Sequence, residues 1–121
     1  MFINILYSLL LLVIMLGTND ALAHAIVTGT SLSIQPLMAD RNSIVSLQFN
    51  SDVELSLSKV YLVREGDIFE ELRKSKGIKP GELFVVIPPL SAGSYAIRYK
   101  VFAADGHITE NTIRFKVTMG H

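Results

Sequence analysis

Short segments of alternating apolar and polar residues fill much of this chain and limit what it can fold into. Every second residue from Tyr95 to Val101 is apolar, and the alternation returns at Ile113, Phe115 and Val117. Successive side chains of a strand point to opposite faces, so a period of two predicts strands with one buried face. Beyond the apolar start of the chain, no window shows the 3.6-residue period of an amphipathic helix.

Two further segments give equally plain strand signals. Residues 43–50 alternate, with Val45, Leu47 and Phe49 on one predicted face. Residues 83–87 form a continuous apolar run that is typical of a strand buried in a sandwich. Together with the weaker segments, these patterns predict about seven short strands separated by turn signals. The sequence therefore predicts an all-β protein, an antiparallel Greek-key β-sandwich of immunoglobulin-like type.

The weaker segments carry more specific expectations. Residues 53–63 are predicted as one β segment with a bend or bulge near Ser58, where the apolar phase shifts. Residues 68–72 fit either a short strand or a helical turn. Residues 73–81 are rich in Lys, Gly and Pro and predict an exposed loop. Tyr95 follows a corner glycine and is a candidate for a tyrosine corner, its hydroxyl bound to nearby backbone.

The first residues of the chain have the layout of a secretory signal peptide. Residues 2–16 are almost entirely apolar, and Ala21, Leu22 and Ala23 then form an Ala-x-Ala cleavage site. An uncleaved membrane anchor is the alternative, but a spanning helix needs about 20 apolar residues and this run is shorter. We expect residues 1–23 to be a signal peptide cleaved after Ala23, residues 24–121 to form one domain, and the mature protein to be exported without stable membrane insertion.

Composition excludes several kinds of function. The chain has 11 Lys and Arg, 11 Asp and Glu and no Cys, and the leader removes only one acid, Asp20. A nearly neutral domain without a basic run is not expected to bind nucleic acid. The lack of Cys excludes thiolate as a nucleophile or ligand, so a metal would be held by nitrogen and oxygen atoms, or weakly by Met. No hydrolase motif is present either.

Two of the three histidines, His24 and His107, form a candidate metal site with Asp105. Asp105 and His107 are two residues apart in a connection between strands, so their side chains can converge, and Gly106 between them has no side chain to obstruct the ligand position. Cleavage after Ala23 makes His24 the first residue, where the α-amine and the imidazole can bind one metal together. A tetragonal set of nitrogen and oxygen donors suits copper(II), which heads the divalent affinity order.

Simpler interpretations of the same residues remain open. Asp-Gly is a common turn pair, so residues 105–107 need be no more than a surface turn. Asp52 is a weak candidate for a group beside the site and is otherwise a turn residue. His121 could join the site, although a frayed terminus is the simpler expectation.

Several motifs together resemble the CopC copper-resistance family. They are the His-Ala pair after the cleavage site, Leu-Gln-Phe with a later Val-Glu (residues 47–54), Pro-Leu-Ser-Ala-Gly-Ser-Tyr (residues 89–95), Tyr-Lys-Val-Phe-Ala-Ala-Asp-Gly-His (residues 99–107) and Phe-Lys-Val (residues 115–117). The resemblance covers nearly all of the mature chain. It implies a cupredoxin-related sandwich in the periplasm that binds one copper(II) ion through His24, Asp105 and His107, and a possible partner in an inner-membrane copper transporter of the CopD type.

The chain also departs from the pattern of that family. Residues 30–33 lack the usual Ser-Pro-Ala-x-Gly segment, and Tyr99 stands where the family usually has Trp. Asn50 and Ser51 follow Phe49 where the family often has Ser and an acid. The Met-rich loop of copper(I)-binding members is missing, which implies a site for copper(II) alone.

Three functions follow from these observations. The first is a non-enzymatic periplasmic protein that buffers copper(II) or carries it for resistance or uptake. The second is a copper oxidase resembling lytic polysaccharide monooxygenases, which also chelate copper with an amino-terminal His. The third is an immunoglobulin-like interaction module that binds no metal.

Overall fold

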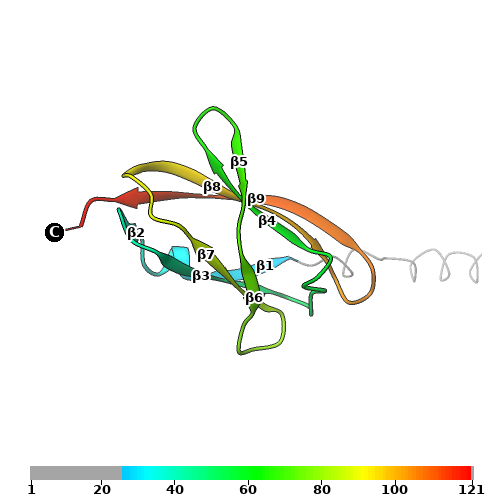
Figure 1. Ribbon diagram of the computed structural model, residues 1–121. Coiled ribbons are helices and arrows are strands. Elements are labelled where there is room, and N and C mark those ends of the chain that lie inside the picture. Colours follow the sequence, from blue (N-terminus) through cyan, green and yellow to red (C-terminus); the bar gives the residue numbers. More distant parts are fainter. Residues whose placement is uncertain (1–25, 121) are drawn as a thin grey trace, which may run out of the picture.

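The computed structural model describes residues 26–120, which form a sandwich of two β-sheets (Figure 1). These residues contain nine strands and one short 3-10 helix, η1 (Ser31–Ser33). The predicted all-β sandwich is confirmed, with two strands more than the expected seven. Among residues 26–120, no helix has the length and apolar character needed to span a membrane.

The first sheet has four antiparallel strands. Its order is β1 (Val27–Thr30), β3 (Ser43–Phe49), β7 (Glu82–Ile87) and β6 (Lys74–Lys76). The edge strands β1 and β6 are the shortest, as expected for edges that must not pair with other chains.

The second sheet has five strands, of which one pair is parallel. Its order is β2 (Leu37–Met38), β9 (Ile108–Thr118), β8 (Gly93–Phe102), β4 (Lys59–Arg64) and β5 (Ile68–Glu71). The two-residue strand β2 runs parallel to β9, so the predicted purely antiparallel arrangement is corrected at this edge. The long β8–β9 hairpin forms the centre of this sheet and ends in the turn that contains Asp105.

The core lies between the sheets and follows the predicted alternation. Val45, Leu47 and Phe49 on β3 are at most 2% exposed, and so are Ile97 and Tyr99 on β8. The Phe49 and Tyr99 rings join the two sheets in an edge-to-face contact, with centroids 5.3 Å apart. Such a contact adds about 0.5–1.5 kcal/mol to the apolar burial. This packing fixes the ends of β3 and β8, which flank the candidate site.

Two of the weaker strand and loop predictions, those for residues 53–63 and 73–81, are wrong. Of the expected 53–63 segment only residues 59–63 lie in a strand, β4, because the predicted bend near Ser58 is a full turn at residues 55–57. Ser58 itself is buried. The Ser58 hydroxyl donates to the Glu54 carbonyl at 2.8 Å and accepts the Phe102 N–H at 3.1 Å, which holds the turn against β8. Residues 73–81 are not simply a loop, because they include the edge strand β6. Residues 68–71 form strand β5, which is the first of the two expected alternatives.

The tyrosine corner is present. The Tyr95 hydroxyl donates to the Ser91 carbonyl at 2.7 Å, four residues back along the chain. This bond closes the corner between β7 and β8, and the Tyr95 ring also stacks on Phe115 at a centroid distance of 5.9 Å.

The Tyr95→Phe substitution is expected to lower the free energy of unfolding by about 0.5–1.5 kcal/mol, the net value of one hydrogen bond. Chemical denaturation measures the loss. Tyr61→Phe is the matched control, because among residues 26–120 no hydrogen bond of the Tyr61 hydroxyl is found, and it should leave stability unchanged. Equal losses in the two variants would show that the corner bond contributes nothing.

Candidate metal centre

The turn between β8 and β9 places Asp105 and His107 on one side of a tight loop. Gly106 N–H donates to the Ala103 carbonyl at 2.9 Å, and Ala103 N–H donates to the His107 carbonyl at 2.8 Å. Gly106 has a φ of 92°, which closes a three-residue hairpin loop of a common kind. The sequence pattern predicts a longer connection, residues 103–110, but the turn is shorter because β9 already begins at Ile108. Asp105 and Gly106 do form a turn, which is the part of their role that the simpler interpretation predicted.

The same turn brings the two predicted side chains together. Oδ2 of Asp105 lies 3.0 Å from Nδ1 of His107, and Oδ1 accepts the backbone N–H of His107 at 3.1 Å. Both side chains are about half exposed. The hydrogen bond from the His107 backbone, helped by the imidazole, holds the pKa of Asp105 below its usual value. A carboxylate bound to one ring nitrogen orients an imidazole and directs its other nitrogen, Nε2, toward a metal.

His24, the third predicted ligand, lies outside the described residues, as does His121. The described chain begins at Ile26, whose N–H donates to Oδ1 of Asn50 at 2.8 Å. Asn50 N–H donates in return to the Ile26 carbonyl at 3.0 Å. The chain is therefore fixed two residues after His24, and two residues span at most about 7 Å.

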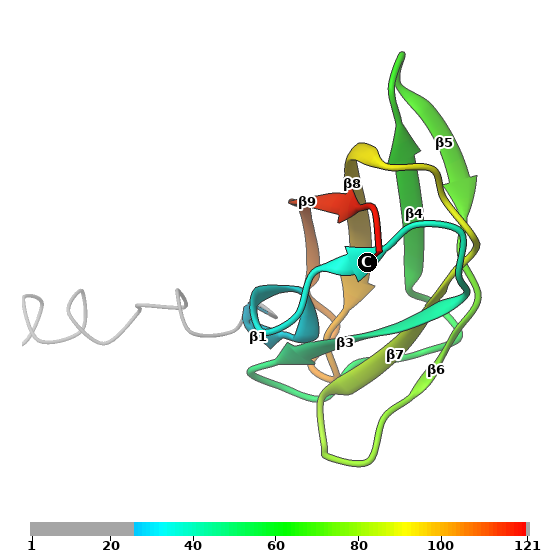
Figure 2. The ribbon, with the colours of Figure 1, turned by 90° about the vertical axis from the view of Figure 1, so that its left-hand side faces the viewer.

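Backbone contacts join this anchor to the β8–β9 turn. The Asp52 carbonyl accepts the Ala104 N–H at 3.0 Å, and Val53 forms a bridge with Ala103. Residues 50–53 thus hold Ile26 at one end and contact the residues just before Asp105 at the other. Figures 1 and 2 show the start of β1 at the same end of the sandwich as the β8–β9 turn, on the flank where β1 faces β9.

The side chain of Asp52 is engaged away from this turn. Its Oδ1 accepts the N–H of Val53 at 3.0 Å and lies 3.6 Å from Nζ of Lys76 on β6. These contacts account for Asp52 as a turn residue, the simpler of its two interpretations.

Two hydroxyl groups near the same end have no partner within residues 26–120. Oγ of Ser51 and Oγ1 of Thr109 are buried without a hydrogen bond. Ser51 follows Asn50, and Thr109 comes two residues after His107. In the described part of the chain, no three His, Cys, Asp or Glu side chains gather closely enough to hold a metal. A metal held by Asp105 and His107 would therefore need a further donor from outside the described residues.

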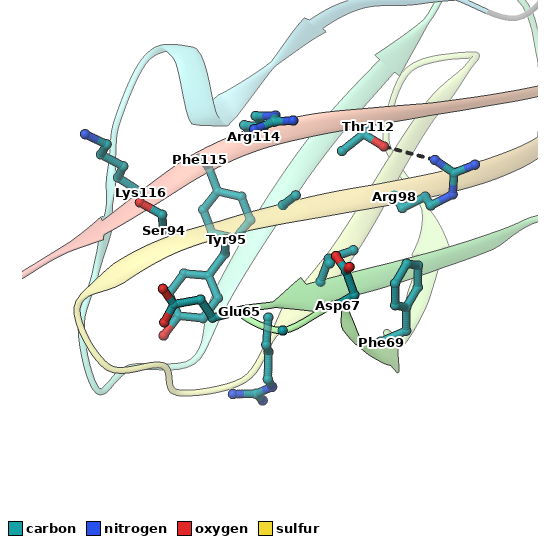
Figure 3. A pocket seen from close by; sticks show the side chains of 14 residues that line it. Glu65, Asp67, Phe69, Ser94, Tyr95, Arg98, Thr112, Arg114, Phe115 and Lys116 are labelled. Atoms are coloured by element: carbon teal, nitrogen blue, oxygen red, sulfur yellow. Dashed lines mark hydrogen bonds between the residues drawn. The ribbon is translucent and has the colours of Figure 1, made fainter.

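A hollow of about 650 Å³ lies elsewhere, on the outer face of the five-stranded sheet beside the β4–β5 hairpin (Figure 3). Phe69, Tyr95 and Arg98 are among its lining residues. Arg98 is already engaged by Thr112 at 3.2 Å and by Glu110 at 2.9 Å. The lining contains no histidine and none of the predicted ligands, so this hollow is not the candidate metal site.

The chain is thus a small β-sandwich that carries the paired side chains of Asp105 and His107 in a turn at one end. Residues 27–118 match the CopC domain. The chain belongs to the CopC family, which confirms the resemblance inferred from the motifs. A comparison with curated proteins found no significant match.

Solved structures agree with this assignment. CopC from Methylosinus trichosporium OB3b is 28% identical, with a TM-score of 0.68, over 81% of this chain and 97% of that one. PcoC from Escherichia coli, described as a methionine-rich copper resistance protein, is 20% identical, with a TM-score of 0.59, over 78% and 98% of the two chains. A superoxide reductase from Ignicoccus hospitalis is 12% identical, with a TM-score of 0.50, over 84% and 88%. The last two show a common fold alone.

Proposed function

We propose that this protein binds one copper(II) ion at the end of the sandwich and buffers or carries it in the periplasm. The paired side chains of Asp105 and His107 are the observation that carries the proposal, because they lie at the end where β1 begins. His24 would complete the site with its α-amine and imidazole. Membership of the CopC family supports copper as the metal.

The arrangement suggests a division of roles among the donors. Asp105 occupies Nδ1 of His107, which favours Nε2 of that ring as the metal ligand. His24 would contribute two nitrogens and His107 a third. Asp105 lies on Nδ1 of His107 in the structure, where it holds the imidazole in place, and it would supply the oxygen ligand only by turning from Nδ1 to the metal. Three nitrogens and one oxygen form a tetragonal donor set, which suits copper(II) better than it suits copper(I).

The proposed location follows from the first 23 residues. Cleavage after Ala23 would release the domain into the periplasm and expose the amine of His24. An inner-membrane transporter of the CopD type is the partner to which the metal would pass. The intact mass of the exported protein tests this step, and a mass that includes residues 1–23 would contradict the proposed amino-terminal ligand.

A copper(II) titration of the chain beginning at His24 tests the function itself. We expect one-to-one binding and an electron paramagnetic resonance spectrum with nitrogen hyperfine structure. The absence of binding would leave a metal-free interaction module as the better account. Oxidation of a polysaccharide by the loaded protein with a reductant would instead favour the oxidase.

Copper(II) affinity is expected to fall at least about tenfold between pH 7.5 and pH 5, because protons compete for imidazole and amine nitrogens. Asp105 should contribute little to this change. The His107 N–H lowers the pKa of Asp105, so its carboxylate stays ionised to lower pH than an ordinary one. Competition titrations at both pH values measure the effect, and equal affinities would argue against nitrogen ligands.

A further inference from the structure

Asn50 holds the segment that leads to His24, although no motif marks it as part of the site. The last register pair at this end of β1 and β3 is Val27 with Phe49. Beyond it, Oδ1 of Asn50 accepts the N–H of Ile26 at 2.8 Å, and Asn50 N–H donates to the Ile26 carbonyl at 3.0 Å. These two bonds extend the pairing of the strands by one residue toward the amino terminus.

The side chain of Asn50 does here what a backbone carbonyl does in a regular sheet. In an antiparallel hydrogen-bonded pair, the two residues exchange both backbone N–H to carbonyl bonds. The Asn50 amide oxygen replaces its own carbonyl as the acceptor for Ile26. The chain can therefore leave β3 at this point and turn toward Ala104, while it still holds the start of β1.

We infer that Asn50 is a positioning residue, which fixes Ile26 so that His24 reaches the metal beside His107. This inference rests on the proposed copper(II) site. Without the acceptor, the N–H of Ile26 would lose its partner and this residue would fray. Metal binding would then have to order one more residue, which corresponds to roughly a tenfold loss of affinity.

Three variants of the mature chain test this role. Asn50→Leu keeps the approximate size of the side chain and removes the acceptor, whereas Asn50→Asp restores an acceptor at the same position. Thr28→Val is the matched control, because it removes another side-chain bond between β1 and β3, from Oγ1 of Thr28 to the Gln48 carbonyl. Amide hydrogen exchange of Ile26 is measured without metal, and copper(II) affinity by competition.

We expect Asn50→Leu to speed the exchange of Ile26 and to weaken copper(II) binding by about tenfold. Asn50→Asp should recover both properties, and Thr28→Val should bind as the wild type does. Wild-type affinity in Asn50→Leu, or unchanged exchange of Ile26, would overturn the inference while the proposed function stands. A wild-type chain that binds no copper(II) would overturn the proposed function instead, and with it the positioning role.

Discussion

Acetylation of the α-amine of His24 in the mature protein is expected to weaken copper(II) binding by at least about 100-fold. An acetylated nitrogen is an amide, which has no basic lone pair at neutral pH, so the chelate between amine and imidazole is lost. Removing an outer partner of a metal ligand already costs about 10–100-fold in affinity, and a direct donor should cost at least the upper value. Competition with a copper(II) chelator measures the change.

The matched control is the mature chain made by the same route without the acetyl group. His24→Ala supplies the complementary variant, because it keeps the amine and removes the ring. Copper(II) affinity should fall in both altered chains, and the nitrogen hyperfine pattern of the bound copper should change. Wild-type binding by the acetylated chain would show that the metal lies elsewhere and that the position of His24 after Ala23 is incidental.

The sequence predicted those parts of the fold whose apolar alternation is imposed by burial. Val45, Leu47 and Phe49 had to face the core together, because a shift of one residue would turn all three outward. The edge strand β6 gave no such signal, since its sequence is Lys-Ser-Lys and, among residues 26–120, it pairs with β7 alone. The turn before Ser58 depends on the distant Phe102 N–H, which no local pattern reveals.

The candidate site likewise has one part that local sequence determines and one part that depends on distant contacts. The convergence of Asp105 and His107 was predictable because both lie within one hairpin turn, so local geometry determines it. The expected approach of the amino terminus would depend on contacts between distant residues, namely Ile26 with Asn50 and Asp52 with Ala104. The sequence could suggest this approach only indirectly, through the cleavage site before His24, the chelating chemistry of an amino-terminal His and a family resemblance.

His107→Ala is expected to reduce copper(II) affinity by at least about 100-fold without disturbing the sandwich. The substitution removes the imidazole but keeps the backbone bond from Ala103 N–H that closes the turn. The side chain is half exposed, so the free energy of unfolding should change by no more than about 0.5 kcal/mol. Copper(II) competition and chemical denaturation, measured on the same samples, separate a lost ligand from a lost fold.

Two further variants make this result specific. Asp105→Asn keeps an oxygen that can accept the His107 N–H, but its neutral amide loses the charge that holds the imidazole, so we expect a loss of about 10–100-fold. His121→Ala removes the remaining histidine and should bind as the wild type does. If His107→Ala and His121→Ala bound copper(II) equally well, the Asp105 and His107 pair would be a hairpin turn and no metal site. If all three variants lost affinity together with stability, the effect would belong to the fold. Only a graded loss, largest for His107→Ala, smaller for Asp105→Asn and absent for His121→Ala, fits an imidazole ligand oriented by a neighbouring carboxylate.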